Sequence, residues 1–233
     1  MFEVKQKQKI VVFTGAGMSA ESGLKTFRDS NGLWEQYRVE DVATPDAWRR
    51  NPELVLRFYN ERLQQTLQAK PNDGHRIIAD WQKKFDIQVI TQNVDDLHER
   101  AGSKNVLHLH GELTKMRSSI DEELVFSIKE GKINYGDLCP KGSQFRPHIV
   151  WFGEAVPAME RAIDMVTEAD ILVVVGTSLV VYPAANLIHY TSFTCKKYLI
   201  DPGNFEESVL QGIHHIKKNA SVGLKEMENI LLK

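Results

Sequence analysis

The clearest signal for the fold is the segment Lys9-Ile-Val-Val-Phe-Thr-Gly-Ala-Gly17. Its first part is a short β-branched run, which predicts a buried strand, and the glycines after it predict a tight turn. Gly15-x-Gly17 directly after a strand is typical of dinucleotide-binding folds, because glycine lets the backbone approach a pyrophosphate at a helix N-terminus. On this motif alone a second interpretation stays open, since any tight strand-to-helix turn needs glycine.

Working outward, the sequence alternates between strand-like and helix-like segments. Further strands are predicted at Asp86–Thr91, at Ala169–Val175 before Gly176-Thr-Ser178, and at Lys197–Ile200. Helical patterns separate them, over residues 52–68, 74–85, 156–168, 183–190 and 220–232. Strands that alternate with helices predict an α/β fold with a parallel, doubly wound, Rossmann-like sheet.

Two stretches interrupt this alternation. Residues 25–50 read as loop with scattered aromatic side chains, and residues 112–147 are irregular and charged. We interpret both as insertions that form a small second lobe, from about 25–75 and 112–147, within a single domain spanning 1–233. The remaining residues form the large lobe.

Composition narrows the function classes. The chain has 233 residues, 42% of them hydrophobic, and a formal net charge of -2, which predicts no direct nucleic-acid binding. The longest apolar run, Ile171 to Val175, is too short to span a bilayer, and the first residues lack the apolar core of a signal peptide. Two cysteines, Cys139 and Cys195, imply no disulfide framework, so we expect a cytoplasmic protein without membrane contact.

A dehydrogenase is the weakest candidate for the glycine turn. Such an enzyme needs a second strand and an acidic residue about 20 residues on. Glu40 and Asp41 lie at that distance, but the segment before them, from Asn31 to Tyr37, does not read as a strand.

Five blocks in fixed order point to a different use of the cofactor. They are Gly15-Ala-Gly-Met-Ser-Ala-Glu-Ser-Gly23 with Thr26-Phe-Arg28 and Gly32-Leu-Trp34; Thr91-Gln-Asn-Val-Asp95; His108-Leu-His-Gly111; Trp151-Phe-Gly-Glu154; and Gly176-Thr-Ser-Leu179. Together they resemble the sirtuin family of NAD-dependent protein deacylases. The resemblance implies a single catalytic domain that binds NAD and an acyl-lysine protein or peptide.

The resemblance also implies roles around the cofactor. Gly15 and Trp34 belong to the cofactor loop. The diphosphate and ribose would be contacted by Ala16, Gly17 and Ser19, while Phe27 would shield the reacting ribose carbon and Arg28 would order the loop. At the nicotinamide end, Gln92 and Asn93 would contact the ribose and Asp95 would hold the carboxamide. The adenosine site would be lined by Gly176, Thr177, Ser178 and Ala220.

Catalysis and substrate binding are assigned in the same way. His110 would be the general base and Asn93 its catalytic partner, whereas His98 and His108 are expected to serve structure. An extended peptide would be clamped by backbone hydrogen bonds from two segments (Trp151, Phe152, Gly153, Glu154, and Val180 to Tyr182).

Chemical reasoning is consistent with these roles. Displacing nicotinamide with an amide oxygen, a poor nucleophile, needs an enclosed pocket and close positioning, and one imidazole suffices as base. No serine or cysteine nucleophile is required, and no G-x-S-x-G motif is present. A mono-ADP-ribosyltransferase and a catalytically weak NAD-binding module remain as alternatives.

The sequence departs from the family at two places. The family's structural zinc needs two C-x-x-C pairs, but Ser118 and Asp121 fill the first pair, and only Cys139 remains of the second, whose other position is Gly142. We therefore predict no zinc, and expect apolar contacts or mobility in residues 115–143 instead (Leu124, Val125, Phe126, Ile128, Ile133, Tyr135, Leu138). Asp201 stands where the family usually has an asparagine at the adenosine ribose.

The helix over residues 52–68 carries the clue to the acyl group. Its apolar arc contains Leu54, Val55, Phe58 and Tyr59, and helical spacing places Arg62 within it. A guanidinium there would reach the rim, pair with an internal carboxylate or meet an anionic ligand. Tyr59-x-x-Arg62 with the small Ala43 resembles the sirtuin class that removes succinyl and malonyl groups, so the resemblance implies an acidic acyl substrate.

Overall fold

The computed structural model describes residues 7–25, 33–34 and 37–232, and its centre is a six-stranded parallel sheet. The strand order is β11-β10-β9-β1-β4-β5, so successive strands are added first on one side of β1 and then on the other. This confirms the predicted doubly wound α/β fold. The strands are β1 (Lys9–Thr14), β4 (Asp86–Thr91), β5 (Val106–His108), β9 (Ile171–Val175), β10 (Lys196–Ile200) and β11 (Ile213–Ile216).

Alternate residues of the central strand enter two different cores. Val11 and Phe13 of β1 face one side of the sheet, while Ile10 and Val12 face the other, and all four are fully buried. A strand buried on both faces reads as a continuous apolar run, which explains the KIVVF sequence.

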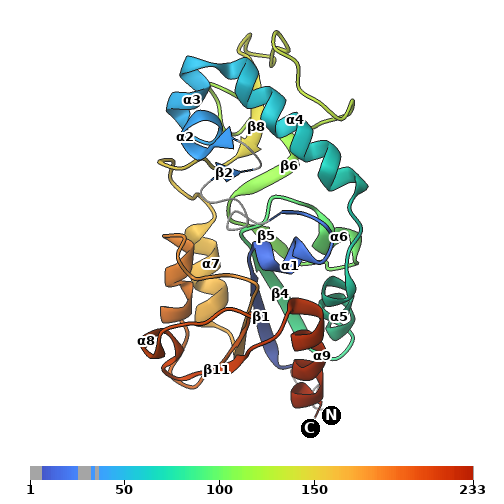
Figure 1. Ribbon diagram of the computed structural model, residues 1–233, viewed down its shortest axis with the longest axis vertical. Coiled ribbons are helices and arrows are strands. Elements are labelled where there is room, and N and C mark those ends of the chain that lie inside the picture. The colour runs from blue at the N-terminus through green and yellow to red at the C-terminus, as the bar shows by residue number, and fades with distance from the viewer. Residues whose placement is uncertain (1–6, 26–32, 35–36, 233) are drawn as a thin grey trace, which may run out of the picture.

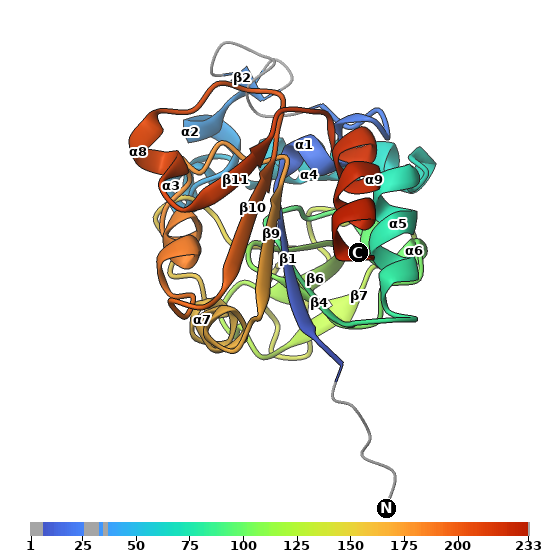
Figure 2. The ribbon, with the colours of Figure 1, turned by 90° about the horizontal axis from the view of Figure 1, so that it is seen from below.

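Helices cover both faces of this sheet (Figure 2). One face packs against α7 (Met159–Thr167), the 3-10 helix η2 (Ala184–His189) and α8 (Glu207–Leu210). The other packs against α1 (Ala16–Ala20), α5 (Asp73–Trp81) and α9 (Ala220–Leu231). A short helix, α6 (Leu97–Arg100), follows β4 beside α5.

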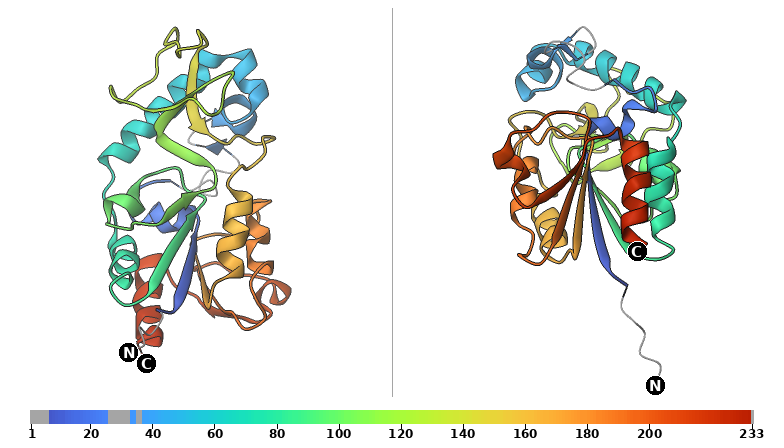
Figure 3. Two further views of the ribbon diagram at one scale, coloured as in Figure 1. Left: turned by 180° about the vertical axis from the view of Figure 1, so that it is seen from behind. Right: turned by 60° about the horizontal axis from the view of Figure 1, so that its bottom comes forward.

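A second, smaller sheet lies beyond the carboxyl ends of the parallel strands (Figures 1 and 3). It is antiparallel, with the order β7-β6-β8, and it packs against α4. The elements of this region are β2 (Leu33–Trp34), β3 (Tyr37–Arg38), α2 (Val39–Val42), α3 (Pro45–Arg50), α4 (Pro52–Gln68), β6 (Gly111–Ser118), β7 (Val125–Ser127) and β8 (Phe145–Ile149).

Helix α4 ties the long loop after β7 to the rest of the small sheet. The side-chain amide of Asn60 donates to the carbonyl of Ile133 and accepts its N–H, both at 2.9 Å. Gln64 donates to the carbonyl of Gly131 at 2.8 Å. Ile133 is buried as expected, but Tyr135 and Leu138 are 62% and 59% exposed, so the expectation that these two hold the loop by burial is wrong. Paired amide hydrogen bonds take that role because the loop reaches α4 with its backbone.

Several predictions of secondary structure need correction. Residues 25–50, which we predicted to be loop, contain the helices α2 and α3. The Thr44 hydroxyl caps the N-terminus of α3. The predicted helix over residues 183–190 is a 3-10 helix, and β5 and β11 were missed. None of the helices among the described residues is long and apolar enough to cross a membrane.

Candidate active site

The two glycine loops meet where the strand order reverses, between β1 and β9. The N–H of Gly15 donates to the carbonyl of Val175 at 3.0 Å, and that of Gly17 donates to the carbonyl of Gly176 at 2.8 Å. A Cβ added at Gly17 would lie 2.7 Å from the Cα of Gly176, so no larger residue fits. Ligands of doubly wound sheets bind outside the carboxyl ends of the strands at this switch point.

Both interpretations of the glycine motif are compatible with this geometry. The fold itself requires glycine, because the loops touch through their backbones. The same contact leaves Ala16 exposed and Gly17 half-buried beyond the carboxyl end of β1. An open backbone turn at a switch point fits a dinucleotide diphosphate.

A cluster of three polar side chains lies next to this turn. The Ser19 hydroxyl donates to Asp95 at 2.9 Å and accepts from the Asn93 amide at 3.1 Å. The Asn93 amide also donates to the carbonyl of Gly15 at 3.0 Å, and the second Asp95 oxygen accepts the N–H of Leu97. Burial raises the pKa of the Asp95 carboxyl, while the bond from Ser19 lowers it. These contacts join the end of β4 to α1.

His110 lies between β5 and β6, with its ring fixed by one hydrogen bond. Its Nδ1 lies 3.1 Å from the carbonyl oxygen of Gln92. A carbonyl only accepts, so Nδ1 carries the proton and the neutral ring keeps its lone pair on Nε2. Burial lowers the pKa of His110, against a smaller raising effect of the Gln92 carbonyl. The residue is thus a neutral base with a defined orientation.

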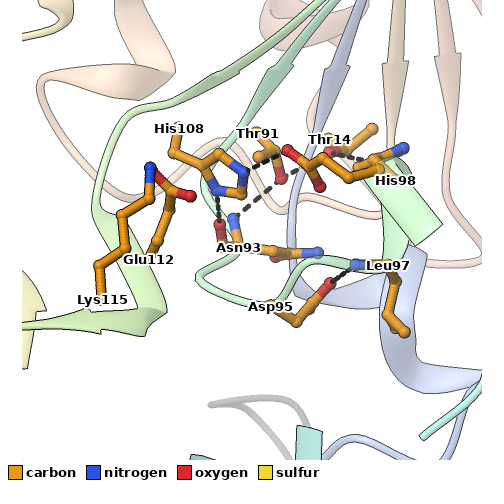
Figure 4. Close-up of polar contacts among 10 residues, drawn as sticks. Thr14, Thr91, Asn93, Asp95, Leu97, His98, His108, Glu112 and Lys115 are labelled. Atoms are coloured by element: carbon orange, nitrogen blue, oxygen red, sulfur yellow. Dashed lines mark hydrogen bonds and ion pairs between the residues drawn. The ribbon is translucent and has the colours of Figure 1, made fainter. Parts of the chain in front are cut away.

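Two other histidines, His108 and His98, lie near the ends of the parallel strands, close to Asn93 and Thr14 (Figure 4). His108 donates to the carbonyl of Asn93 at 3.0 Å and to Glu99 at 2.8 Å. Burial lowers the pKa of His108, but the bond with Glu99, the charges of Glu99 and Glu112 and the bond with Asn93 together outweigh burial, so the net shift is upward. His98 lies 3.1 Å from the Thr14 hydroxyl, and burial lowers its pKa well below the ordinary value. His98 thus bonds to the last residue of β1, and His108 bonds to a carbonyl just beyond the end of β4.

The other residues assigned to the cofactor lie just beyond the ends of β4, β9 and β10 and at the start of α9. Gln92 donates to the Thr177 hydroxyl at 3.1 Å, which links the ends of β4 and β9. Asp201, at the end of β10, is buried, and one of its oxygens accepts the N–H of Gly203 at 2.8 Å. Ser178 is half-buried, and Ala220 is buried at the start of α9. Phe27 and Arg28 lie outside the described residues, and only the backbone of Trp34 is described.

The residues assigned to the peptide clamp divide into exposed and buried members. Phe152, Val180 and Tyr182 are 49%, 67% and 69% exposed. Trp151 is buried, Gly153 has a φ of 91°, and the Phe152 N–H donates to the carbonyl of Ala43 at 3.0 Å. The exposed apolar side chains flank the region where the peptide is expected.

The acyl-group residues lie together in the core of the small lobe. Ala43, Tyr59 and Trp151 are each 2% exposed and belong to one apolar cluster. Arg62, one turn after Tyr59 on α4, is half-buried, with its guanidinium carbon 5.7 Å from the centre of the Phe58 ring. Burial raises the pKa of the Tyr59 phenol, and the charge of Arg62 opposes that shift. The structure thus brings a phenol and a guanidinium to one buried face.

Comparisons with known proteins identify the family. The Sir2 family model matches residues 15–183. An NAD-dependent protein deacylase of Bacteroides thetaiotaomicron is 52% identical over 97% of this chain and 98% of its own length. A solved Sir2 homologue with NAD has a TM-score of 0.86 at 38% identity, covering 97% of this chain and 90% of that one. A Sir2 protein with a deacetylated peptide and 3′-O-acetyl-ADP-ribose has a TM-score of 0.80 at 32% identity, covering 96% and 94%.

The chain belongs to the Sir2 family.

The place of the Sir2 zinc site contains a different set of side chains. The Cys139 thiol lies 3.3 Å from the Ser118 hydroxyl and 3.2 Å from that of Ser143, and Asp121 pairs with Lys141 at 2.6 Å. Burial raises the pKa of the Cys139 thiol, but bonds with the hydroxyls of Ser118 and Ser143 and with the backbone of Ser143 and Lys141 together outweigh burial and bring it to about 7. One sulfur, two hydroxyls and a carboxylate already paired with lysine do not fit tetrahedral zinc. In the part of the chain that is described, no group of three metal-binding side chains was found.

Sequence reasoning missed a buried ionic cluster in this Sir2 protein. Arg146 binds both oxygens of Glu154, at 2.7 and 3.1 Å, and Arg117 approaches the same carboxylate at 3.4 Å. The two arginines are cross-strand neighbours on β6 and β8, where like charges repel unless an anion lies between them. Both arginines lie at strand positions flanked by apolar or small residues, and this pattern was the signal in the sequence that could have indicated their burial.

Proposed function

We propose that this chain is an NAD-dependent protein-lysine deacylase that prefers succinyl- and malonyl-lysine, with release of nicotinamide and O-acyl-ADP-ribose. The relatives named above support the deacylase activity. The observation that supports the acidic preference is the placement of Tyr59 and Arg62 on one inward face of α4, in the same cluster as Ala43 and Trp151. A carboxylate can accept from a phenol and from a forked guanidinium together.

The residues around the crevice have distinct parts in this proposal. When bound, NAD supplies the ribosyl carbon that accepts the acyl oxygen, with nicotinamide as leaving group. Asn93 and Asp95, fixed through Ser19, would orient the nicotinamide end. His110 would remove a proton from a ribose hydroxyl with Nε2, because Gln92 holds the proton on Nδ1. The lowered pKa keeps this base unprotonated at neutral pH.

The remaining assignments extend this proposal to the whole chain. Residues 1–233 form one catalytic domain, with a small lobe that binds the acyl group and a large lobe that binds NAD. Asp201 would accept from a ribose hydroxyl through its other oxygen. We place the protein in the cytoplasm because both cysteines are free. Its partners are acyl-lysine proteins or peptides, without nucleic acid or membrane, and the lobe contains no zinc.

The decisive assay measures nicotinamide release with NAD and matched acetyl-, malonyl- and succinyl-lysine peptides. Arg62→Met should lower kcat/KM on the acidic peptides, because a charged hydrogen bond is lost, and the loss should correspond to roughly 2–4 kcal/mol. The kcat/KM on the acetyl-lysine peptide should stay nearly unchanged. Arg57→Met, on the exposed face of α4, is the control.

Equal losses on acetyl and succinyl peptides would show that Arg62 is structural and the enzyme a plain deacetylase. Label from NAD on protein, without free O-acyl-ADP-ribose, would instead identify an ADP-ribosyltransferase.

A further inference from the structure

The turn formed by residues 151–154 is closed twice. The Glu154 N–H donates to the Trp151 carbonyl at 3.0 Å, and the Trp151 N–H donates to the Glu154 carboxylate at 2.8 Å. Arg146 forks onto that carboxylate and also donates to the carbonyl of Ile149 at 2.9 Å. The backbone of Trp151 is therefore fixed by its own turn and by a cation from β8.

The indole of Trp151 is fixed as well. The guanidinium carbon of Arg146 lies 3.2 Å from the centre of the indole, a stacking contact that suits a planar cation. Trp48 packs against the same indole at 5.8 Å between ring centres. With neighbours on Trp151 from β8 and α3, the direction of its N–H is set before any ligand arrives.

Two hydrogen-bond donors in this cluster are buried without a hydrogen-bond partner among the described residues: the Trp151 indole nitrogen and the Tyr59 hydroxyl. Both side chains are 2% exposed, and both belong to the cluster that contains Ala43. An interaction with the Trp151 indole lowers the pKa of the Tyr59 phenol, against the larger raising effect of burial, so the two groups are near each other although their geometry does not complete a hydrogen bond. Buried indole and phenol groups ordinarily have a partner, and an indole nitrogen can only donate.

We propose that Trp151 is a specificity-determining residue whose indole N–H donates to the carboxylate of an acidic acyl group, beside the Tyr59 hydroxyl. The inference rests on the acidic-acyl function proposed above. A carboxylate has two oxygens with about four acceptor sites, enough for the Arg62 fork, the phenol and the indole. An acetyl group has no acceptor at that depth, so the indole N–H does not assist its removal.

The test replaces the N–H while keeping a flat ring. Trp151→Phe is assayed with acetyl-, butyryl- and succinyl-lysine peptides, where butyryl fills a similar length without a charge. We expect kcat/KM to fall about tenfold more on succinyl-lysine than on the acetyl and butyryl peptides, because one hydrogen bond to the carboxylate is lost, while any loss through the peptide contacts of position 151 is common to all three. Trp48→Phe, which alters the neighbouring indole, is the matched control and should show no dependence on the acyl group.

A second variant guards against a packing effect. Benzothienylalanine at position 151 has the shape of tryptophan with sulfur in place of the N–H, and it should reproduce the succinyl-selective loss. Equal losses on butyryl and succinyl peptides, or no loss with benzothienylalanine, would overturn the inference.

The same assay separates this inference from the proposed function. If wild type prefers succinyl-lysine and Arg62→Met removes that preference, the proposed function stands whatever Trp151 shows. If wild type shows no preference for succinyl-lysine, the acidic preference and the role of Trp151 fall together, while acetyl-lysine turnover still reports the deacylase.

Discussion

At the scale of single residues, the proposed function assigns the proton transfer to His110. Its Nδ1 is committed to the Gln92 carbonyl, so removing the ring removes the base without breaking the cofactor crevice. His110→Ala should reduce product formation by about 100- to 10,000-fold, with NAD binding and melting temperature nearly unchanged. Product analysis, NAD calorimetry and thermal melts measure the three quantities. His189→Ala, at an exposed histidine, is the control; an alanine variant with more than a tenth of wild-type turnover would refute the assignment.

The same residue sets an expected pH dependence. Burial lowers the pKa of His110 below the ordinary histidine value, and only the neutral ring accepts a proton. Activity should therefore be constant as pH falls to about 6.5 and decline only below it. The profile of kcat against pH, with saturating NAD and peptide, measures this. An acid limb centred above that value would show that another group controls the step.

At the scale of elements, the loops around Cys139 determine whether the small lobe needs metal. Bonds of Ser118 and Ser143 with Cys139, the Asp121–Lys141 pair and the Asn60–Ile133 bonds join these loops. A structural zinc contributes on the order of 10 kcal/mol to such modules. We predict that a chelator changes neither melting temperature nor activity. Stoichiometric zinc in the purified protein, lost together with activity, would be the contrary result.

The elements also show what sequence could and could not predict. The buried strand β4 and the helix α4 were predicted with their observed bounds, because apolar periodicity and caps are local signals. The edge strands β5 and β11 were missed, since each is short and contains histidine beside few apolar residues. They are strands because a neighbouring strand offers hydrogen bonds, which is a tertiary effect.

The site divides in the same way. Motif blocks in the sequence pointed to His110 and to the glycine turn, because each lies within a short run of characteristic residues. The Arg146–Glu154 pair and the contact of Arg146 with the Trp151 indole went unpredicted, because nothing in the spacing of these residues specifies which way their side chains turn.

At the scale of the whole molecule, two buried histidines link folding to pH. Burial lowers the pKa of His75 to about 4, and its ring packs 4.8 Å from that of His98. In the unfolded chain a histidine titrates near 6.5, so between those values the unfolded state binds more protons, and the free energy of unfolding falls as pH falls.

Glutamine at position 75 tests this linkage. His75 occupies the third position of the α5 capping box, where glutamine also bonds the cap. When pH falls from 7 to 5, the free energy of unfolding should decrease in both proteins, but the decrease should be smaller in His75→Gln by up to about 2 kcal/mol. Urea unfolding at both pH values measures it, with His214→Gln at an exposed histidine as control. Parallel losses in wild type and His75→Gln would exclude His75 as the source.

The location of Tyr59 and Arg62 on a single turn of α4 has a consequence for laboratory evolution. These two positions lie on one helix of the small lobe, while the Ser19–Asn93–Asp95 cluster lies at the end of the parallel sheet. A library randomised only at codons 59 and 62 would therefore vary the range of acyl groups accepted without changing the residues proposed to bind the cofactor. If the proposed acyl role holds, new substrate ranges would be reachable in one or two mutational steps.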